Sequence, residues 1–416
     1  MSQSTPDTPR WVRLTFVDVL GTSNSVQMPG RHFDEAVARG ALFDGSSIQG
    51  RARALEADML LRPDPSTLFR RGDVARVACT VCTPDGTPWP ADPRTALVAL
   101  LAGSGPVAEL AEAWTSAAEL ELYLLDGREP LDRDGYFDDR EGLGMQLTRR
   151  AADELVAAGV DILSCHHEAG PSQYEIDLAP LAPLALADAL VLAKQVVREV
   201  AAEAGVLATF MPRPLAGEAG SGLHLLQHVD GLVERGNRLT DDGRAFVAGI
   251  LTHARALAAV ASPTVNSYKR LTERLVDGTN SWAPVWATYG DNNRSCLLRL
   301  PRNRPCVENR GVDSAANPYL TSAFLLAAGL EGVREQLDPG EPVEDLTYDW
   351  SPDDAPQLRL PRTLLEAVDA FEADPLVAAV FPPQFVTEYV AMKREEWNEF
   401  HGQVTAWERA KYFDMF

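Results

Sequence analysis

The chain has 416 residues, 45% of them apolar, so it can bury a large core, and we expect two domains rather than one. Its formal net charge of −22 argues against a nucleic-acid or anionic-membrane surface, because such binding depends on clustered Lys and Arg. Every run of roughly 18 residues contains charge, so no membrane span is expected.

Short elements are predicted for the first part of the chain. Residues 1–10 are polar and contain proline, and we expect them to be disordered. Strands and turns are expected over 11–18, 21–24 and 25–29, a short helix near 33–39, and strands near 57–62 and 74–82. The proline-rich segment Thr87–Pro93 then marks a boundary, so we expect a first domain at 11–90 and a second at 91–416.

The second domain combines strands with long helical patterns. Helices are predicted near 142–158, 184–204, 240–260, 314–335 and 384–408. Five cysteines, at positions 79, 82, 165, 296 and 306, give no disulfide framework, so we expect a reduced, cytoplasmic protein. Cys79 and Cys82 have redox or metal spacing, but they lie in a β-rich run with no second pair, which favours a structural role.

Six side chains that can bind divalent cations lie in four separate stretches. They are Glu119, Glu121, Glu168, Glu175, His224 and Glu308. The first two lie in the apolar run Ala118–Leu125, where a period of two turns both carboxylates to one face. Two like charges side by side in a strand are unfavourable unless a cation lies between them.

The next two glutamates flank a turn. Ala-Gly-Pro at 169–171 separates Glu168 from Glu175, and a hairpin there would bring the two carboxylates together. Taken singly, each glutamate is more simply explained as an exposed strand charge. His224 and His228 have the i, i+4 spacing of a zinc protease, but no glutamate follows His224 and the segment is β-like, so that reading is disfavoured.

Nine motifs in a fixed order carry a resemblance to the glutamine synthetase superfamily over nearly the whole chain. They are Phe43-Asp-Gly-Ser-Ser47, Arg62-Pro-Asp-Pro-Ser-Thr67, Glu119-Leu-Glu121, His166-His-Glu168, Phe210-Met-Pro-Arg-Pro214, Gly220-Ser-Gly-Leu-His224, Asn266-Ser-Tyr-Lys-Arg-Leu271, Asn293-Arg-Ser295 and Ala316-Asn-Pro-Tyr319. The resemblance implies an α+β chain with a small β-grasp-like N-terminal domain and a large α/β catalytic domain. It also implies a homo-oligomeric ring, usually a dodecamer, with each active site shared between neighbouring subunits.

The resemblance further implies ATP as co-substrate and two or more Mg²⁺ or Mn²⁺ ions. One ion would be held by Glu121, Glu168 and Glu175. The second would be held by Glu119, His224 and Glu308 and would bridge the ATP phosphates. Oxygen-dominated ligands suit magnesium or manganese.

Substrate-binding residues follow from the same motifs. Arg270 and Arg310 match the arginines that hold the glutamate carboxylates, and planar guanidinium groups suit that role. Arg294 and Arg299 match arginines near the transferring phosphate, and Gln227 is assigned to the ATP site with them. Gly220 would let the backbone approach the substrate closely. In a chain this rich in arginine, each of these four arginines could instead be a surface or structural residue.

The flap after Arg270 departs from the ammonia-using relatives. They carry a glutamate just before Ala-Pro, whereas Trp282 stands there in Asp277–Pro284. Tryptophan cannot act as a base, but it offers an apolar wall for a carbon-bearing amine. This version resembles the branch that makes γ-glutamyl polyamines or alkylamides; the alternative is a flap that is simply repacked.

The resemblance also assigns residues to the site that binds the amine. Asp44, Ser47 and Tyr136 match amine-site positions, and Asp44 is our candidate for binding and deprotonating an ammonium group. Three departures, Ala219, Leu226 and Cys306, replace an asparagine, a histidine and an arginine of the family, so ATP or glutamate could bind more weakly.

We therefore expect a ligase that joins the γ-carboxylate of glutamate, or a close analogue, to an amine other than ammonia. A carboxylate does not condense with an amine in neutral water, so it must first become an acyl phosphate. The alternatives are a true glutamine synthetase using ammonia, a non-catalytic regulatory or binding relative, and a two-metal hydrolase outside the family. Partners other than glutamate and a small amine, such as nucleic acid or a membrane, are not expected.

Overall fold

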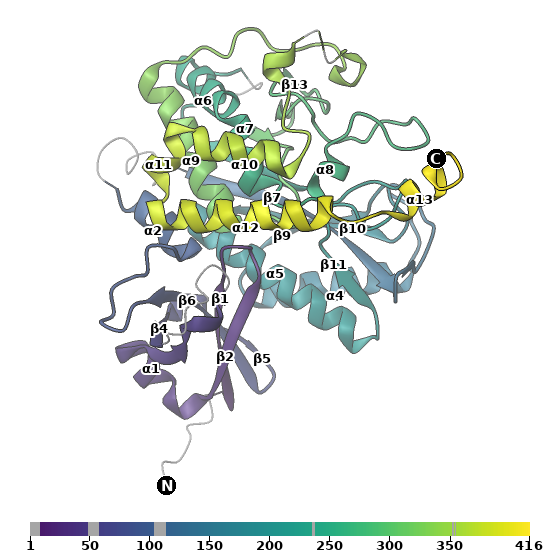
Figure 1. Ribbon diagram of the computed structural model, residues 1–416. Helices are drawn as coiled ribbons and strands as arrows, with labels where there is room; N and C mark the ends of the chain where they lie inside the picture. The colour runs from purple at the N-terminus through teal and green to yellow at the C-terminus, as the bar shows by residue number, and fades with distance from the viewer. Residues whose placement is uncertain (1–8, 49–57, 104–113, 235–237, 352, 354) are drawn as a thin grey trace.

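The computed structural model describes residues 9–48, 58–103, 114–234, 238–351, 353 and 355–416. Of the segment 1–10 that was predicted to be disordered, only residues 9 and 10 fall within the described residues. Figure 1 shows two parts, a small N-terminal domain below and a large domain above it.

The N-terminal domain is a six-stranded sheet in the order β2-β1-β6-β4-β3, with β5 paired to β6. The parallel pair β1 and β6 lies inside the sheet, and its other pairs are antiparallel. Its elements are β1 (Trp11–Val17), β2 (Ser23–Pro29), α1 (Phe33–Arg39), β3 (Ala41–Asp44), β4 (Asp58–Pro63), β5 (Phe69–Arg71) and β6 (Val74–Cys82). Val12, Leu14, Met59 and Leu61 are fully buried between them, as the alternation of the strands requires.

The large domain is built on a nine-stranded sheet in the order β13-β14-β15-β12-β7-β10-β9, with β8 and β11 also paired to β7. These strands are β7 (Trp114–Asp126), β8 (Glu129–Pro130), β9 (Ile162–His167), β10 (Gln173–Leu181), β11 (Leu207–Thr209), β12 (Leu223–Val229), β13 (Tyr289–Asp291), β14 (Leu298–Leu300) and β15 (Val307–Asn309). The strand β7 is long and central, so residues along it meet neighbours on both sides.

Helices pack around this sheet. They are α2 (Pro93–Leu101), α4 (Leu143–Ala157), α5 (Pro183–Glu203), α6 (Asp241–Thr252), α7 (Ala254–Ala261), α8 (Ser267–Arg270), α9 (Pro318–Glu335), α10 (Leu364–Ala373), α11 (Pro375–Val380), α12 (Pro383–His401) and α13 (Ala406–Tyr412). The helix α5 packs on β7, β10 and β11, and α9 packs in turn on α2, α5, α6 and α7. The fold is α+β, as predicted.

Three predicted helices differ from the structure. The helix predicted at 240–260 is the pair α6 and α7, bent by 69° at His253, whose ring is hydrogen-bonded to Asp374 at 2.8 Å and to Glu331. The helix predicted from 314 begins at Pro318, because the side chain of Asn317 caps it. The helix predicted at 384–408 ends at His401, and α13 starts afresh at a capping box.

Ion pairs fasten the small domain to the large one. Arg94 binds Asp188 of α5 through Nη2 at 2.8 Å and binds Asp64 of the small domain at 2.7 Å through the same nitrogen. Arg13 of β1 binds Glu199 of α5 at 2.8 Å. The small domain is therefore held against α5 and Arg94 of α2.

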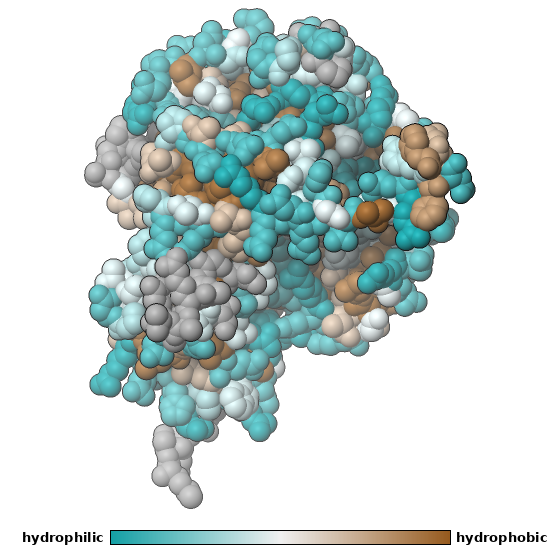
Figure 2. All heavy atoms as spheres, viewed as in Figure 1, coloured by the Kyte–Doolittle hydropathy of each residue, from teal (hydrophilic) through white to brown (hydrophobic). Residues whose placement is uncertain are grey.

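The surface agrees with the acidic composition. Figure 2 shows hydrophilic side chains over most of the visible face, with apolar side chains visible between α10 and α12 and near the C-terminus, where Phe413 and Phe416 are exposed. Among the described residues, no single helix is long and apolar enough to cross a membrane. The bent pair α6 and α7 passes that test of length and composition together, and most of its residues are buried.

Candidate active site

The candidate active site is built on β7 and the strands beside it. Leu120 and Leu122 of β7 are fully buried in the core, so Glu119 and Glu121 point to the opposite face. Register places Glu175 of β10 opposite Glu121. The predicted strand and its two-residue period are therefore what brings two carboxylates of β7 to one face.

The hairpin predicted between 162 and 177 is present as β9 and β10. Its turn places Glu168 close to Glu175, and Glu168 Oε2 accepts a hydrogen bond from the Ala169 amide at 3.0 Å. On the other side of β7, His224 of β12 lies opposite Glu119, with Nδ1 3.0 Å from Glu119 Oε2. Glu308 follows on β15, the next strand of the sheet.

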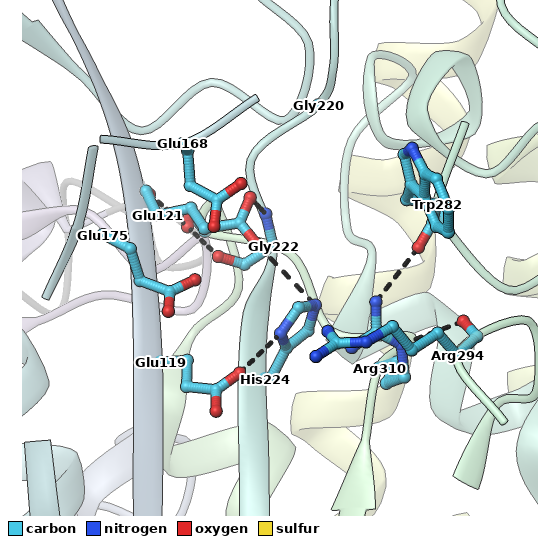
Figure 3. A network of polar contacts seen from close by, with 12 residues as sticks. Glu119, Glu121, Glu168, Glu175, Gly220, Gly222, His224, Trp282, Arg294 and Arg310 are labelled. Atoms are coloured by element: carbon cyan, nitrogen blue, oxygen red, sulfur yellow. Dashed lines mark hydrogen bonds and ion pairs between the residues drawn. The ribbon is translucent and has the colours of Figure 1, made fainter. Parts of the chain in front are cut away.

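These side chains line a cavity of about 860 Å³. Its walls contain the six predicted metal ligands and seven of the predicted substrate and ATP residues: Glu119, Glu121, Glu168, Glu175, His224, Glu308, Tyr136, Gly220, Arg270, Trp282, Arg294, Arg299 and Arg310. Figure 3 shows the strand glutamates on one side of His224 and Trp282, Arg294 and Arg310 on the other. The structure thus brings together residues that the sequence separates by up to 191 positions, from Glu119 to Arg310.

The carboxylates and histidine form sets compact enough for a metal ion. Glu119, His224 and Glu308 each offer one ligand atom, all within 4.8 Å of one another, and this set coincides with the second predicted metal site. Glu121 and Glu175 form another such set with His224, and Glu168 and Glu175 form a third with His166. Carboxylates dominate every set, so the donors fit Mg²⁺ or Mn²⁺.

The glutamates of the cavity differ in whether a positively charged or hydrogen-bonding partner balances their charge. Burial, together with repulsion from Glu121, raises the pKa of Glu168 to about 8, and the same causes raise the pKa of Glu175 well above its usual value. Burial alone would also raise the pKa of Glu119, but the hydrogen bond from His224 lowers it to about 2. The Glu168 and Glu175 end therefore lacks a counter-charge that a cation would supply.

Glu308 is balanced by two arginines instead. It is fully buried, and its two oxygens accept hydrogen bonds at 2.7 Å from Arg299 Nη1 and Arg310 Nη1. Burial would raise the pKa of Glu308, but the positive charge of Arg310 lowers it. These charge-assisted bonds fix the carboxylate before any ligand binds.

Backbone groups set the position of Glu121. Its Oε2 accepts hydrogen bonds from the Gly222 amide at 2.8 Å and from Gln173 Nε2 at 3.0 Å. A Cβ on Gly222 would lie 2.8 Å from both His224 Nε2 and Arg270 Nη2, so any other residue would displace these two site side chains. The glycine-rich motif therefore serves close packing of the chain beneath the metal ligands.

Two buried arginines face the cavity as candidate carboxylate binders. Arg270 donates through Nη2 to the Arg310 carbonyl at 3.1 Å, and its Nη1 has no hydrogen-bond partner within the described part of the chain. Arg310 donates from Nε to the Arg294 carbonyl at 3.1 Å and from Nη2 to the Trp282 carbonyl at 3.2 Å. An unpaired, buried guanidinium donor is costly unless a ligand oxygen meets it.

Aromatic side chains border the opening of the cavity. Trp282 is 51% exposed and has a φ of 61°, a left-handed conformation that is unusual for so bulky a residue. Tyr136 is 50% exposed and meets the edge of His166 at 5.8 Å between ring centroids. Burial and the charge of Glu168 raise the pKa of Tyr136 to about 12, so its hydroxyl stays protonated.

Three predicted site residues do not lie in this cavity. Asp44 ends β3 in the small domain, is exposed, and accepts a hydrogen bond from the Ser46 amide at 2.9 Å. Ser47 lies in the turn that follows it. Gln227 is buried on the other face of β12, where its oxygen accepts hydrogen bonds from Trp114 Nε1 and Ser116 Oγ, both at 2.8 Å.

Several cavity residues were not singled out from the sequence. His166 Nε2 lies 3.2 Å from Glu175 Oε1, and Asp177 lies opposite Glu119 in the register of β10. Strand parity gives the missing signal for Asp177, since it is two residues beyond Glu175. Two of the departures already noted, Leu226 and Cys306, form a small buried apolar cluster with Ala117, and Leu226 lines the cavity.

Comparison with known proteins gives a consistent result. The family description "Glutamine synthetase, catalytic domain" matches residues 94–412, and "Glutamine synthetase, beta-Grasp domain" matches residues 8–84. Proteins named glutamine synthetase from Mycobacterium bovis and Methanosarcina mazei are each 37% identical to the chain. The alignments cover 98% of the chain in both cases, and 96% and 95% of those proteins.

Solved structures agree with this. A structure described as a GmaS/ADP complex superposes with a TM-score of 0.87, covering 98% of the chain and 97% of its own at 30% identity. GmaS without ligand gives a TM-score of 0.85 at the same identity and coverage. The chain therefore belongs to the glutamine synthetase family, and it is an ATP-dependent ligase that forms carbon–nitrogen bonds.

Proposed function

We propose that the protein joins the γ-carboxylate of glutamate, or of a close analogue, to an amine other than ammonia. Members of the family use glutamate, an amine, ATP and divalent metal ions, and they form ring oligomers. The proposal goes beyond the family in the choice of amine. It also takes γ-glutamyl phosphate as the intermediate.

The observation that carries this proposal is Trp282. Its half-exposed indole lines the cavity, and its carbonyl is hydrogen-bonded to Arg310, a candidate substrate-binding residue. An indole has no proton-accepting group that could deprotonate ammonium, whereas its face excludes water and contacts carbon. A carbon-bearing amine gains from that surface and ammonium does not.

In the proposed mechanism, Arg270 and Arg310 hold the carboxylates of the amino acid, and the strand glutamates with His224 hold the divalent ions. Those ions supply charge neutralisation for the transfer of the γ-phosphoryl group. A γ-carboxylate oxygen attacks the γ-phosphorus and ADP leaves. The amine nitrogen then attacks the acyl carbon, phosphate leaves, and the proton of the amine passes to a carboxylate.

We assign that last role to Asp44 of a neighbouring subunit. Asp44 lies in the small domain, outside the cavity of its own chain, and it is exposed at the end of β3. Hydrogen bonds from the Ser46 hydroxyl and amide lower the pKa of Asp44, so it is ionised and can bind an ammonium group. Assembly of a ring would deliver it to the site of the adjacent chain.

A second candidate is synthesis of glutamine itself. The names of the curated relatives favour it, because several proteins 35–37% identical to this chain are named glutamine synthetase. Under this reading another carboxylate would have to replace the missing flap base. Tyr136 and Trp282 would then border a pocket larger than ammonium requires.

A panel of amines tests the two candidates directly. The purified protein is given ATP, magnesium, glutamate and one amine at a time, and phosphate release and product mass are recorded. We expect alkylamines, ethanolamine or polyamines to give amide products with kcat/KM well above that for ammonium. Fastest turnover with ammonium would refute the proposal and establish the second candidate, and turnover without any amine would refute both.

A further inference from the structure

The loop 301–306 between β14 and β15 borders the cavity and carries an arginine, Arg304, to which neither metal binding nor substrate binding has been assigned. Arg304 lines the cavity, and 36% of its side chain is exposed. Among the described residues its guanidinium makes one ion pair, from Nη1 to Glu119 Oε1 at 3.4 Å. That distance is long for a charge-assisted hydrogen bond.

The neighbouring arginines are engaged more tightly. Arg299 and Arg310 each donate to Glu308 at 2.7 Å, and that fully buried carboxylate needs both of them. Glu119, by contrast, already bonds His224 at 3.0 Å, so it does not depend on Arg304 alone. Of these three guanidinium groups, that of Arg304 is the one free to turn to a ligand.

Part of the wall beside Arg304 is apolar, and Asn303 is the other polar side chain of this loop that lines the cavity. Ala117, Leu226 and Cys306 form a buried apolar cluster there, next to the set formed by Glu119, His224 and Glu308. A phosphate chain bound at that set carries several negative charges and needs donors beyond the metal ion. Arg304 is the basic side chain of the loop that reaches this part of the cavity.

We propose that Arg304 binds phosphate oxygens of the nucleotide when a divalent ion occupies the set Glu119, His224 and Glu308. The ion neutralises Glu119, so Arg304 exchanges its long contact with that carboxylate for a phosphate oxygen. This inference rests on the proposed use of ATP and adds a nucleotide-binding residue that the sequence motifs do not include. It also explains how the site can work with an apolar residue at position 306.

Binding of MgADP, followed by titration calorimetry, tests this inference without turnover. We expect Arg304→Gln to weaken MgADP binding by about 10- to 100-fold, the range for losing one charge-assisted hydrogen bond. Arg304→Lys keeps the charge and should retain part of the affinity. The control is Arg302→Gln on the same loop, because Arg302 is exposed, pairs with Asp291 at 3.4 Å and does not line the cavity.

The affinity for MgADP separates this role from a structural one. If Arg304 only neutralises Glu119, its removal leaves MgADP binding intact and strengthens binding of free Mg²⁺, because the carboxylate loses a competing cation. Unchanged MgADP affinity in a folded Arg304→Gln protein, checked by circular dichroism, would overturn the inference. A wild type that binds no MgADP would instead refute the proposed function.

Discussion

Substitution of Trp282 gives the sharpest test of the amine pocket. Trp282 is about half exposed and lines the cavity, so an alkyl chain can lie against its ring. Each methylene removed from water contributes about 0.8 kcal/mol, or about fourfold in kcat/KM. In wild type we therefore expect kcat/KM to rise by about fourfold per methylene from methylamine upwards, until the chain extends past the ring.

The variants should respond differently. Trp282→Ala should flatten the dependence on chain length without gaining activity toward ammonium, and Trp282→Glu should narrow the preference by adding a carboxylate that can bind ammonium. Both variants keep the backbone carbonyl of residue 282, which accepts a hydrogen bond from Arg310. A difference between the variants therefore reports on the side chain and not on this contact. Steady-state kcat/KM for ammonium and a series of alkylamines provides the measurement. Equal losses for all amines in both variants would show that the indole only packs the flap, and would refute this reasoning.

Three further predictions concern the ligands, the ring and stability. Glu175→Ala and His224→Ala should each abolish turnover while the protein stays folded by circular dichroism; for Glu175→Ala the thermal midpoint of the metal-free protein should stay unchanged or rise, because one of several crowded carboxylates is removed, and wild-type turnover in either variant would remove the two-metal assignment. Mixing inactive Asp44→Ala with inactive Glu175→Ala subunits should restore some activity in reassembled rings, whereas a monomer by light scattering, or no activity despite verified mixing, would contradict a shared site. Burial would lower the pKa of His253, but its two carboxylate partners raise it. The ion pairs of His253 therefore stabilise the fold fully below about pH 6.5, and this stabilisation is lost as the pH rises through the folded-state pKa. The difference in urea midpoint between wild type and His253→Gln should shrink from pH 6 to pH 8, and a constant difference would contradict this.

Local patterns predicted the framework of the site well. The alternation in β7 and the turn after Glu168 are both properties of a few neighbouring residues, and both appear in the structure. The same alternation along a strand argues against the assignment of Gln227 to the ATP site. Since His224 faces the cavity, Leu226 must also face it and Gln227 must face away, which is how the structure has them.

Features that depend on distant partners were harder to predict. The bend at His253 reflects carboxylates at positions 331 and 374, which no local pattern around 253 reveals. The pairing of Glu308 with Arg299 likewise needs the register of β14 and β15, whereas Arg310 lies only two residues beyond Glu308. The proposed role of Asp44 can be tested only in an oligomer, because within a single chain Asp44 lies outside the cavity.

The ion pairs of Glu308 with Arg299 and Arg310 make the charge of the cavity differ between its two ends. At that end Arg299 and Arg310 offset the charges of Glu308 and the nearby Glu119, whereas the end at Glu168 and Glu175 holds closely spaced acids without such counter-charges. Figure 3 shows Glu168 and Glu175 on one side of His224 and Arg310 on the other. A polyanionic nucleotide and a cationic amine are thus drawn to different ends of one chamber, so the two reactants are sorted before they meet. Filling the acidic end with divalent ions weakens its attraction for amines, which favours an order in which metal and nucleotide bind first and the amine enters last.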